Sequence, residues 1–204
     1  MAANGNEYSV TNCSAIILAA GRSRRLGSPK QLLNYQGKTL LQHSIDIAKK
    51  ASVQSVIVVL GSDFDLLLSQ VDSAGLHIIK NDNWQTGIAS SISCGINALE
   101  DIAPIADAAI LMVCDQPFVN PELLNELLTV QKATNKPIIA SSYGNTIGIP
   151  ALFHRRFFQQ LLDLKGDSGA KKIVQLNPDS LETVPFTLGS IDIDTLDDYE
   201  SLSK

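Results

Sequence analysis

The chain alternates short apolar runs with longer segments in which apolar residues recur every three or four positions. The short runs have the length and the β-branched content of strands, and the longer segments have the spacing of helices that bury one face. Strands are predicted at residues 15–20, 55–61, 76–81, 108–115, 137–142, 149–153 and 181–186. Helices are predicted within residues 39–51, 62–75, 86–99 and 120–133, the last with Asn120 as its N-cap and Pro121 in its first position.

The strand runs are apolar almost throughout rather than at alternate positions. Such strands are covered on both faces, and their alternation with helices predicts a doubly wound, mostly parallel α/β sheet. Turn residues are denser in segments 142–150 and 164–172, which predicts a small antiparallel excursion in the second half. We expect the polar residues 1–12 to form a flexible N-terminal tail and residues 13–204 a single domain.

The composition narrows the classes of function. Of the 204 residues 45% are apolar and 18% charged, and the net charge of -5 argues against nucleic acid or an anionic membrane as a partner. Three widely spaced cysteines without a C-x-x-C pair indicate neither a zinc knuckle nor a disulfide framework, and favour a cytoplasmic location. No apolar run approaches the ~18 residues of a membrane span, and no apolar signal core opens the sequence.

Doubly wound sheets bind ligands at the carboxyl ends of their strands. The first such loop, "GRSRRLGSPK" at 21–30, concentrates positive charge in a region without an acidic residue between Tyr8 and Ile45. Glycine-loop N–H groups and convergent cations make a polyphosphate cradle; an ordinary solvated loop is the alternative. The spacing of Gly21 and Gly27 does not fit a Walker A loop, and no G-x-G-x-x-G fingerprint occurs. The cations of this region are Arg22, Arg24, Arg25, Lys30 and Lys38.

Acidic residues mark two further places. Asp115 ends the predicted buried strand in "AAILMVCDQPFV", where one carboxylate with substrate phosphates and water can hold Mg²⁺; capping of the following turn is the alternative. Asp192 and Asp194 flank Ile193 in "SIDIDTLDDY", so both carboxylates would point to one side of an extended segment. The next two acids of that segment are better explained as first-turn residues of a helix.

One predicted helix opens with small residues. Gly87 and the pair Ser90 and Ser91 lie at its N-terminus, where N–H groups and hydroxyls are free for hydrogen bonding. That arrangement suits the edge of a nucleobase or a sugar hydroxyl. Helix capping and close packing explain the same serines, so both interpretations stand.

The segment "LAAGRSRRLGSPK" resembles the signature L-A-A-G-x-(S/G)-x-R-(M/L)-G-x-x-K of the MobA-like nucleotidyltransferases. These enzymes transfer a nucleoside monophosphate from an NTP to a phosphorylated acceptor. The resemblance continues in "NDNWQTGIASS", "CDQP" and "DIDT", and it spans the chain from about Ala15 to Tyr199. It implies the Rossmann-like fold of nucleotide-diphospho-sugar transferases, with Mg²⁺ as cofactor.

The resemblance also implies roles for individual residues, while Arg22 and Arg24 fall at positions where the family varies. The implied catalytic residues are Arg25, Lys30 and Asp115. The implied metal ligands are Asp115 and Asp194, followed by Asp192. The implied nucleotide-binding residues are Leu18, Ala19, Ala20, Gly21, Arg25, Lys30, Gly87 and Ser91.

Two segments, "GIPALF" (148–153) and "LKGDSGAKK" (164–172), resemble acceptor-side motifs of the branch that acts on the molybdenum cofactor. Ile149 stands where that branch usually has a polar residue. Without the resemblance, the second segment is a turn before a helix. The implied acceptor-binding residues are Gly148, Pro150, Gly166, Asp167, Gly169 and Lys171.

The second alanine of L-A-A-G and the Gln-Pro after Asp115 resemble the cytidylyl branch rather than the guanylyl branch. The expected function is transfer of CMP from CTP to the phosphate of molybdopterin, with release of pyrophosphate. The alternatives are GTP-dependent guanylyl transfer to the same cofactor, CMP transfer to a sugar or polyol phosphate, and a non-catalytic chaperone that binds the cofactor. CTP and the cofactor are the expected partners, a client molybdoenzyme or its chaperone is a further candidate, and we expect a monomer or weak dimer.

Overall fold

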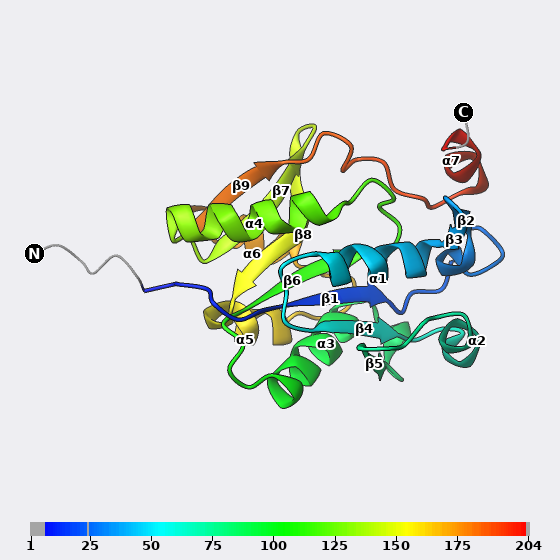
Figure 1. Ribbon diagram of the computed structural model, residues 1–204, viewed down its shortest axis with the longest axis horizontal. Coiled ribbons are helices and arrows are strands. Elements are labelled where there is room, and N and C mark those ends of the chain that lie inside the picture. The colour runs from blue at the N-terminus through cyan, green and yellow to red at the C-terminus, as the bar shows by residue number, and fades with distance from the viewer. Residues whose placement is uncertain (1–6, 24, 203–204) are drawn as a thin grey trace, which may run out of the picture.

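A seven-stranded mixed sheet forms the centre of the protein (Figure 1). The computed structural model describes residues 7–23 and 25–202. The strands are β1 (Cys13–Ala19), β4 (Val56–Leu60), β5 (His77–Lys80), β6 (Ala108–Val113), β7 (Ile138–Tyr143), β8 (Thr146–His154) and β9 (Leu181–Pro185). Their order is β5-β4-β1-β6-β8-β7-β9. β5, β4, β1 and β6 are parallel to one another, β8 is antiparallel to both its neighbours, and β9 is parallel to β7.

Helices cover both faces of the sheet, as the continuous burial of the central strands β1 and β4 requires. The α-helices are α1 (Leu40–Lys50), α2 (Phe64–Ser69), α3 (Ile88–Ile102), α4 (Pro121–Thr134), α5 (Phe158–Leu162), α6 (Lys171–Leu176) and α7 (Leu196–Ser201). The 3₁₀ helices are η1 (Lys30–Leu32), η2 (Trp84–Thr86), η3 (Arg155–Phe157) and η4 (Pro178–Ser180). A small antiparallel hairpin joins β2 (Asn34–Tyr35) to β3 (Lys38–Thr39).

Two hydrophobic cores lie on the two faces of the sheet. α1 and α4 enclose one core, which contains Ile17, and α3, α5 and α6 enclose the other, which contains Ile16. The side chains of successive residues in β1 thus pack on opposite faces of the sheet. α3 lies close against β1, because a Cβ atom on Gly95 would stand 2.6 Å from Cγ2 of Ile16. The glycine therefore sets how closely this helix covers the strand that leads into the first loop.

The predicted fold class is confirmed. The antiparallel excursion is β8, which starts earlier than the predicted 149–153 because a hairpin turn pairs Tyr143 with Thr146. Asn120 caps α4 as predicted, since its side chain accepts a hydrogen bond from the N–H of Leu123 at 2.8 Å. The helix predicted within 62–75 is shorter, because α2 ends before Gln70.

The strand order reverses between β1 and β6. From β1 the sheet grows through β4 and β5 on one side, whereas β6 begins the other side. Ligands of doubly wound sheets bind beyond the carboxyl ends of the strands at such a point. β1 ends at Ala19 and β6 at Val113. The first loop (residues 21–30) and Asp115 therefore lie at the place where the fold predicts a ligand.

The chain returns to this edge after β9. The strap (residues 186–195) leads from β9 to α7, which lies beside the β2–β3 hairpin (Figure 1). The hydroxyl of Tyr199 donates to the carbonyl of Asn34 at 2.7 Å and fastens α7 there. Thr195 and Asp198 form a capping box at the start of α7, so the acids that follow Asp194 are first-turn residues, as predicted.

Part of the predicted tail of residues 1–12 packs against the domain. Residues 1–6 lie outside the described residues. Val10 is buried, and the carboxylate of Asp107 accepts hydrogen bonds from the N–H groups of Thr11 and Asn12 at 3.0 Å each. Among the described residues, none of the helices combines the length and the apolar character that crossing a bilayer requires.

Candidate functional site

Lys30 joins two carboxylates that come from distant parts of the chain. Its ammonium lies 2.5 Å from Oδ2 of Asp115, just beyond β6, and 2.9 Å from Oδ1 of Asp194, in the strap. Arg25, in the first loop, donates to the other oxygen of Asp194 at 2.7 Å. Lys30 is mostly buried, whereas the Arg25 side chain is 67% exposed. The sequence predicted all four residues as site residues, and the structure brings them together.

The charges in this cluster act strongly on one another. Burial alone would lower the pKa of Lys30, but the charge of Asp115 and the hydrogen bonds to Asp115 and Asp194 outweigh it and raise that pKa. The hydrogen bond from Lys30 holds the pKa of Asp194 below its ordinary value against the effect of burial. Burial and then the charges of Asp194 and Asp115 raise the pKa of Asp192. A cation is thus favoured where these carboxylates converge.

The donor set fits a divalent ion that is bound jointly by protein and substrate. Among the described residues, no group of three or more His, Cys, Asp or Glu side chains is arranged to hold a metal. Asp115 and Asp194 nevertheless share one cation, the Lys30 ammonium. Mg²⁺ is typically held by one or two carboxylates with phosphates and water. Asp192 is exposed, and the Lys30 ammonium contacts Asp194 but not Asp192. As a candidate metal ligand, Asp192 therefore ranks after Asp194.

A buried glutamine that sequence reasoning missed fixes the first loop. The amide of Gln31 donates to the carbonyls of Ala19 and Gly21 at 2.9 and 3.0 Å, and only 2% of the residue is exposed. The hydroxyl of Ser23 accepts from the N–H of Lys30 at 2.8 Å. These bonds tie the start of the loop to Lys30, which carries the ammonium, and to its neighbour Gln31. A lone glutamine before "LL" gives no sequence signal of burial.

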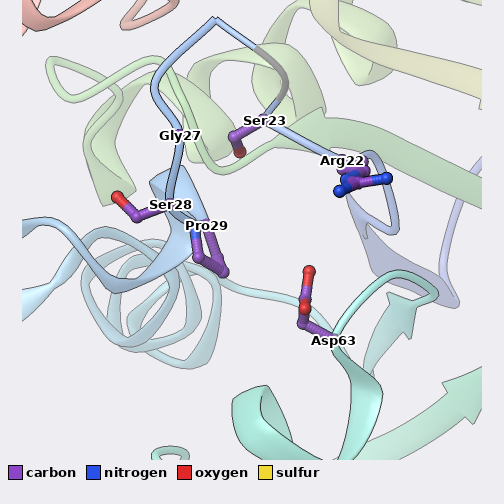
Figure 2. A pocket seen from close by; sticks show the side chains of 6 residues that line it. All are labelled: Arg22, Ser23, Gly27, Ser28, Pro29 and Asp63. Atoms are coloured by element: carbon purple, nitrogen blue, oxygen red, sulfur yellow. The ribbon is translucent and has the colours of Figure 1, made fainter.

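Three cavities adjoin the first loop, and Arg22 lines all of them. The first, of about 420 Å³, is lined by Arg22, Ser23, Gly27, Ser28, Pro29 and Asp63 (Figure 2). The second, of about 380 Å³, is lined by Gly21, Arg22, Trp84, Gln85, Gly87, Ile88, Ser91 and Asp167. The third, of about 290 Å³, is lined by Gly21, Arg22, Ser23, Arg25, Lys30 and Asp194.

These cavities give Arg22 a central position. The sequence left open whether it is only a solvated neighbour of the loop, and it is indeed exposed. Figure 2 shows it across the first cavity from Asp63, whose side chain extends from the start of α2 toward the loop. A flexible cation at the junction of three cavities can reach a phosphate in any of them. Arg24 lies outside the described residues.

Of the three residues predicted at the helix start, Gly87 and Ser91 line the second cavity and Ser90 does not. Asn81 donates to the hydroxyls of Ser90 and Ser91 at 2.9 and 3.0 Å and so orients both. Ser91 is only 4% exposed but contributes to the cavity wall. The sequence places Asn81 at the end of a strand and at the start of the family-like segment "NDNWQTGIASS", but nothing in it reveals that this side chain turns back to α3.

Gly166 and Asp167 lie beside Gly87. The N–H of Ala89 donates to the carbonyl of Gly166 at 3.1 Å, and a Cβ on Gly87 would stand 2.3 Å from that oxygen. Gly87 also has φ +108°, a conformation that glycine adopts readily. The sequence assigned Gly87 to the nucleotide and Asp167 to the acceptor, whereas the structure places both on one cavity wall.

The other acceptor-side predictions do not gather at that wall. Gly148 and Pro150 are buried in β8, and a Cβ on Gly148 would stand 2.4 Å from the hydroxyl oxygen of Tyr143. Lys171 is exposed and donates to the hydroxyl of Thr146, which ties α6 to β8. Gly169 is half-buried near Ile88. In this structure these residues shape the fold around the site rather than line the three cavities.

The four residues predicted to line the nucleotide at the end of β1, Leu18 to Gly21, differ in their exposure to solvent. Leu18, Ala19 and Ala20 are buried, and the carbonyl of Ala20 accepts from the N–H of Ser62 at 3.0 Å. Gly21 is exposed and lines the second and third cavities. Of this run, Gly21 therefore offers its backbone to a ligand, while the residues before it hold the loop in place.

The neighbouring Cys114 does not supply a nucleophile. It is buried, and burial together with the charge of Asp115 raises the pKa of its thiol to about 12. A thiol with that pKa stays protonated and unreactive near neutral pH. The chemistry of this site therefore depends on cations, carboxylates and backbone N–H groups.

Comparisons with known proteins identify relatives of this chain. The nicotine blue oxidoreductase of Paenarthrobacter nicotinovorans is 25% identical over 198 residues, covering 90% of this chain and 93% of that protein. A probable molybdenum cofactor guanylyltransferase of Bacillus mycoides (strain KBAB4) is 24% identical, covering 76% of this chain and 74% of its own length. The crystal structure of Rv0371C from Mycobacterium tuberculosis in complex with manganese is 30% identical, with a TM-score of 0.78, and covers 94% of this chain and 98% of that one.

A family model settles the assignment. The model described as the MobA-like NTP transferase domain matches residues 15–184, which include the first loop, Asp115 and every strand of the large sheet except the first two residues of β1 and the last residue of β9. Because this match covers most of the chain, the protein belongs to the MobA-like NTP transferase family and is a nucleotidyltransferase.

Proposed function

We propose that this nucleotidyltransferase moves CMP from CTP to the phosphate of molybdopterin and releases pyrophosphate. The observation that carries the proposal is the contact of Lys30 with both Asp115 and Asp194 beside the first loop. An ammonium, a guanidinium and two carboxylates at the end of a parallel sheet suit a triphosphate and its metal ion. The resemblance of "CDQP" to the family's motif implies that Asp115 would be a magnesium ligand.

Bond changes at the α-phosphorus define the reaction. An oxygen of the acceptor phosphate attacks that phosphorus, the bond to the β-phosphate oxygen breaks, and pyrophosphate leaves with the electron pair. A phosphate acceptor is already ionised at neutral pH, so the step needs no general base. Positioning and neutralisation of charge do most of the work in such transfers.

The residues of this chain divide that work between them. Lys30 and Arg25 would bind the β- and γ-phosphates and offset the charge on the departing pyrophosphate. Asp115 and Asp194 would hold Mg²⁺, which supplies further neutralisation of phosphate charge when it is bound. When CTP enters, we expect the Lys30 ammonium to exchange its carboxylate partners for phosphate oxygens.

The second cavity is the proposed nucleoside site. Ser91, Gly87 and Asp167 line it beside the exposed backbone of Gly21. Hydroxyl, backbone and carboxylate groups there can hydrogen-bond the edge of a base and the hydroxyls of a sugar. Gly148, Pro150, Gly169 and Lys171 are proposed to shape the acceptor side.

The choice of CTP rests on the likeness of L-A-A-G to the cytidylyl branch. GTP is the second candidate, supported by the Bacillus mycoides relative named a probable molybdenum cofactor guanylyltransferase. CMP transfer to a sugar or polyol phosphate and a non-catalytic carrier of the cofactor rank lower. A carrier has no need of Arg25, Lys30 and Asp115 gathered at one point. Because the three cysteines are free, we assign the reaction to the cytoplasm.

The decisive assay measures pyrophosphate release with ATP, CTP, GTP and UTP, each with and without molybdopterin and each with and without Mg²⁺. We expect release with CTP only when both the acceptor and Mg²⁺ are present. A preference for GTP would overturn the base assignment. Pyrophosphate release with a sugar phosphate as acceptor, and none with any pterin, would overturn the acceptor assignment.

A further inference from the structure

Gln116 follows Asp115 just beyond β6, and it is not among the residues that line the three cavities. The residue is 6% exposed, and its amide nitrogen donates to the carbonyl of Gly189 at 3.0 Å. Gly189 belongs to the strap, three residues before Asp192. A buried amide that is bonded to the strap has no path to a nucleobase. The Gln-Pro pair is therefore not a direct contact with the base.

The strap is attached to two consecutive residues just beyond β6, Asp115 and Gln116. Gln116 holds Gly189 through its side chain, and the carbonyl of Asp115 accepts from the N–H of Ile193 at 2.9 Å. Ile193 is fully buried. These two bonds enclose Asp192 between them, and Asp194 follows immediately. The position of Asp194 relative to Asp115 therefore depends on both attachments.

The attachment at Gly189 is also tightly packed. A Cβ on Gly189 would stand 2.5 Å from ring carbons of both Phe186 and Tyr143. The chain at this point has little room to move sideways. The hydrogen bond from Gln116 thus acts on a segment whose backbone already fits closely against two aromatic rings.

We propose that Gln116 is a positioning residue that holds the strap so that Asp194 meets Asp115 around a shared cation. The inference rests on the proposed function of the carboxylate pair as a metal site. Two carboxylates bind Mg²⁺ well only when they are preorganised at the distances of its small coordination sphere. Release of Gly189 lets the strap fluctuate, so Asp194 spends less time facing Asp115 and the metal affinity falls.

A second buried glutamine provides a matched control. Gln131 in α4 is fully buried, and its amide donates to the carbonyl of Tyr8 at 2.5 Å. In both glutamines the side-chain oxygen is buried and has no hydrogen-bond partner among the described residues. Replacement by methionine removes the same donor at each position and preserves side-chain length. Only one of the two glutamines, however, is bonded to the strap.

The experiment compares Gln116→Met, Gln131→Met and the wild type. Mn²⁺ binding is measured by electron paramagnetic resonance with CTP present, and CTP binding is measured by calorimetry without metal. We expect Gln116→Met to weaken Mn²⁺ binding at least tenfold while CTP binding changes less than twofold. Gln131→Met should lower the unfolding midpoint and leave Mn²⁺ binding within twofold. Equal Mn²⁺ affinities for Gln116→Met and Gln131→Met would overturn the inference.

Hydrogen exchange tests the attachment independently of any metal. The amide of Ile193 should exchange at least tenfold faster in Gln116→Met than in Gln131→Met, and unchanged exchange would overturn the inference. If Gln116→Met does not fold, Gly189→Ala displaces the strap from the other side and should weaken Mn²⁺ binding in the same way. Failure of the wild type to bind Mn²⁺ with CTP would instead overturn the proposed metal site, and the exchange comparison would still test the attachment.

Discussion

The ammonium of Lys30 lies 2.5 Å from Oδ2 of Asp115, although the two residues are 85 positions apart in the sequence. The first loop ends with one partner and β6 leads into the other, so the reversal of strand order brings them together. Asp194 completes the cluster from the strap. The contacts within this cluster lead to predictions for kinetics, nucleotide binding and stability.

Lys30→Met should reduce kcat/KM for CTP by about 10²–10³-fold, because a preorganised cation aimed at the departing phosphate is lost. The measurement is pyrophosphate release under saturating acceptor. Lys38→Met is the matched control, since Lys38 pairs with Asp46 on α1. Its rate should stay within twofold of the wild type. A Lys30→Met enzyme that also stayed within twofold would remove Lys30 from the mechanism.

Arg22→Met should raise the KM for CTP by about 10-fold or more, the loss expected for one charge-assisted hydrogen bond. Arg22 lines all three cavities beside the first loop, which is the reason to expect an effect at a position where the family varies. Arg155→Met serves as control, because that side chain donates to the carbonyl of Pro104, away from the walls of the three cavities. Equal KM values for the two variants would show that Arg22 is only a solvated neighbour.

Gly87→Ala should disturb the wall of the second cavity beside Gly166, where we propose that the nucleoside binds. The new Cβ would stand 2.3 Å from the Gly166 carbonyl oxygen, and the backbone has φ +108°. We expect a loss of about 1–3 kcal/mol in unfolding free energy and a clear rise in the KM for CTP.

Gly144→Ala is the control that separates the effect of backbone strain from the effect of the steric clash with Gly166. Gly144 also has positive φ, at +53°, but a Cβ added there would meet nothing within 4 Å. Urea unfolding should show that this variant loses about 1–2 kcal/mol of unfolding free energy, while its KM for CTP stays unchanged. If both variants raise the KM equally, the apposition of Gly87 and Gly166 is not what shapes the nucleotide site.

The pH dependence of stability should report on Asp194. The hydrogen bond from Lys30 lowers the pKa of this carboxyl in the folded protein, so its contribution is present above the unfolded value of about 3.9 and is lost as the pH falls through the folded value. Urea unfolding should therefore show the wild type more stable than Asp194→Asn at pH 6, with the difference shrinking below about pH 4. A difference that stayed constant from pH 6 to pH 3 would contradict this account.

Much of the architecture follows from local sequence. Continuous apolar runs located all the strands of the large sheet, and the rule that ligands bind at strand ends pointed to Lys30 and Asp115. The convergence of Asp194 on Lys30 could be inferred only from the family resemblance, because Asp194 lies in the strap, 164 positions after Lys30 in the sequence.

Buried amides were the main features that the sequence concealed. Gln31, Asn81 and Gln116 all bond to backbone or hydroxyl groups inside the protein, yet glutamine and asparagine are ordinarily surface residues. From the sequence, Gln116 is a sign of base preference, whereas in the structure its side chain holds the strap. Nothing in the spacing of an isolated amide tells which carbonyl the fold will bring to it.

The most direct test of the proposed reaction follows the α-phosphorus of CTP. CTP labelled at that atom is incubated with Mg²⁺, molybdopterin and the wild-type protein, and the products are separated. The proposed reaction predicts that the label moves to the pterin, in a product that contains CMP, while pyrophosphate is released unlabelled and in equal amount. Label that remains in CTP or appears only as free CMP would contradict it.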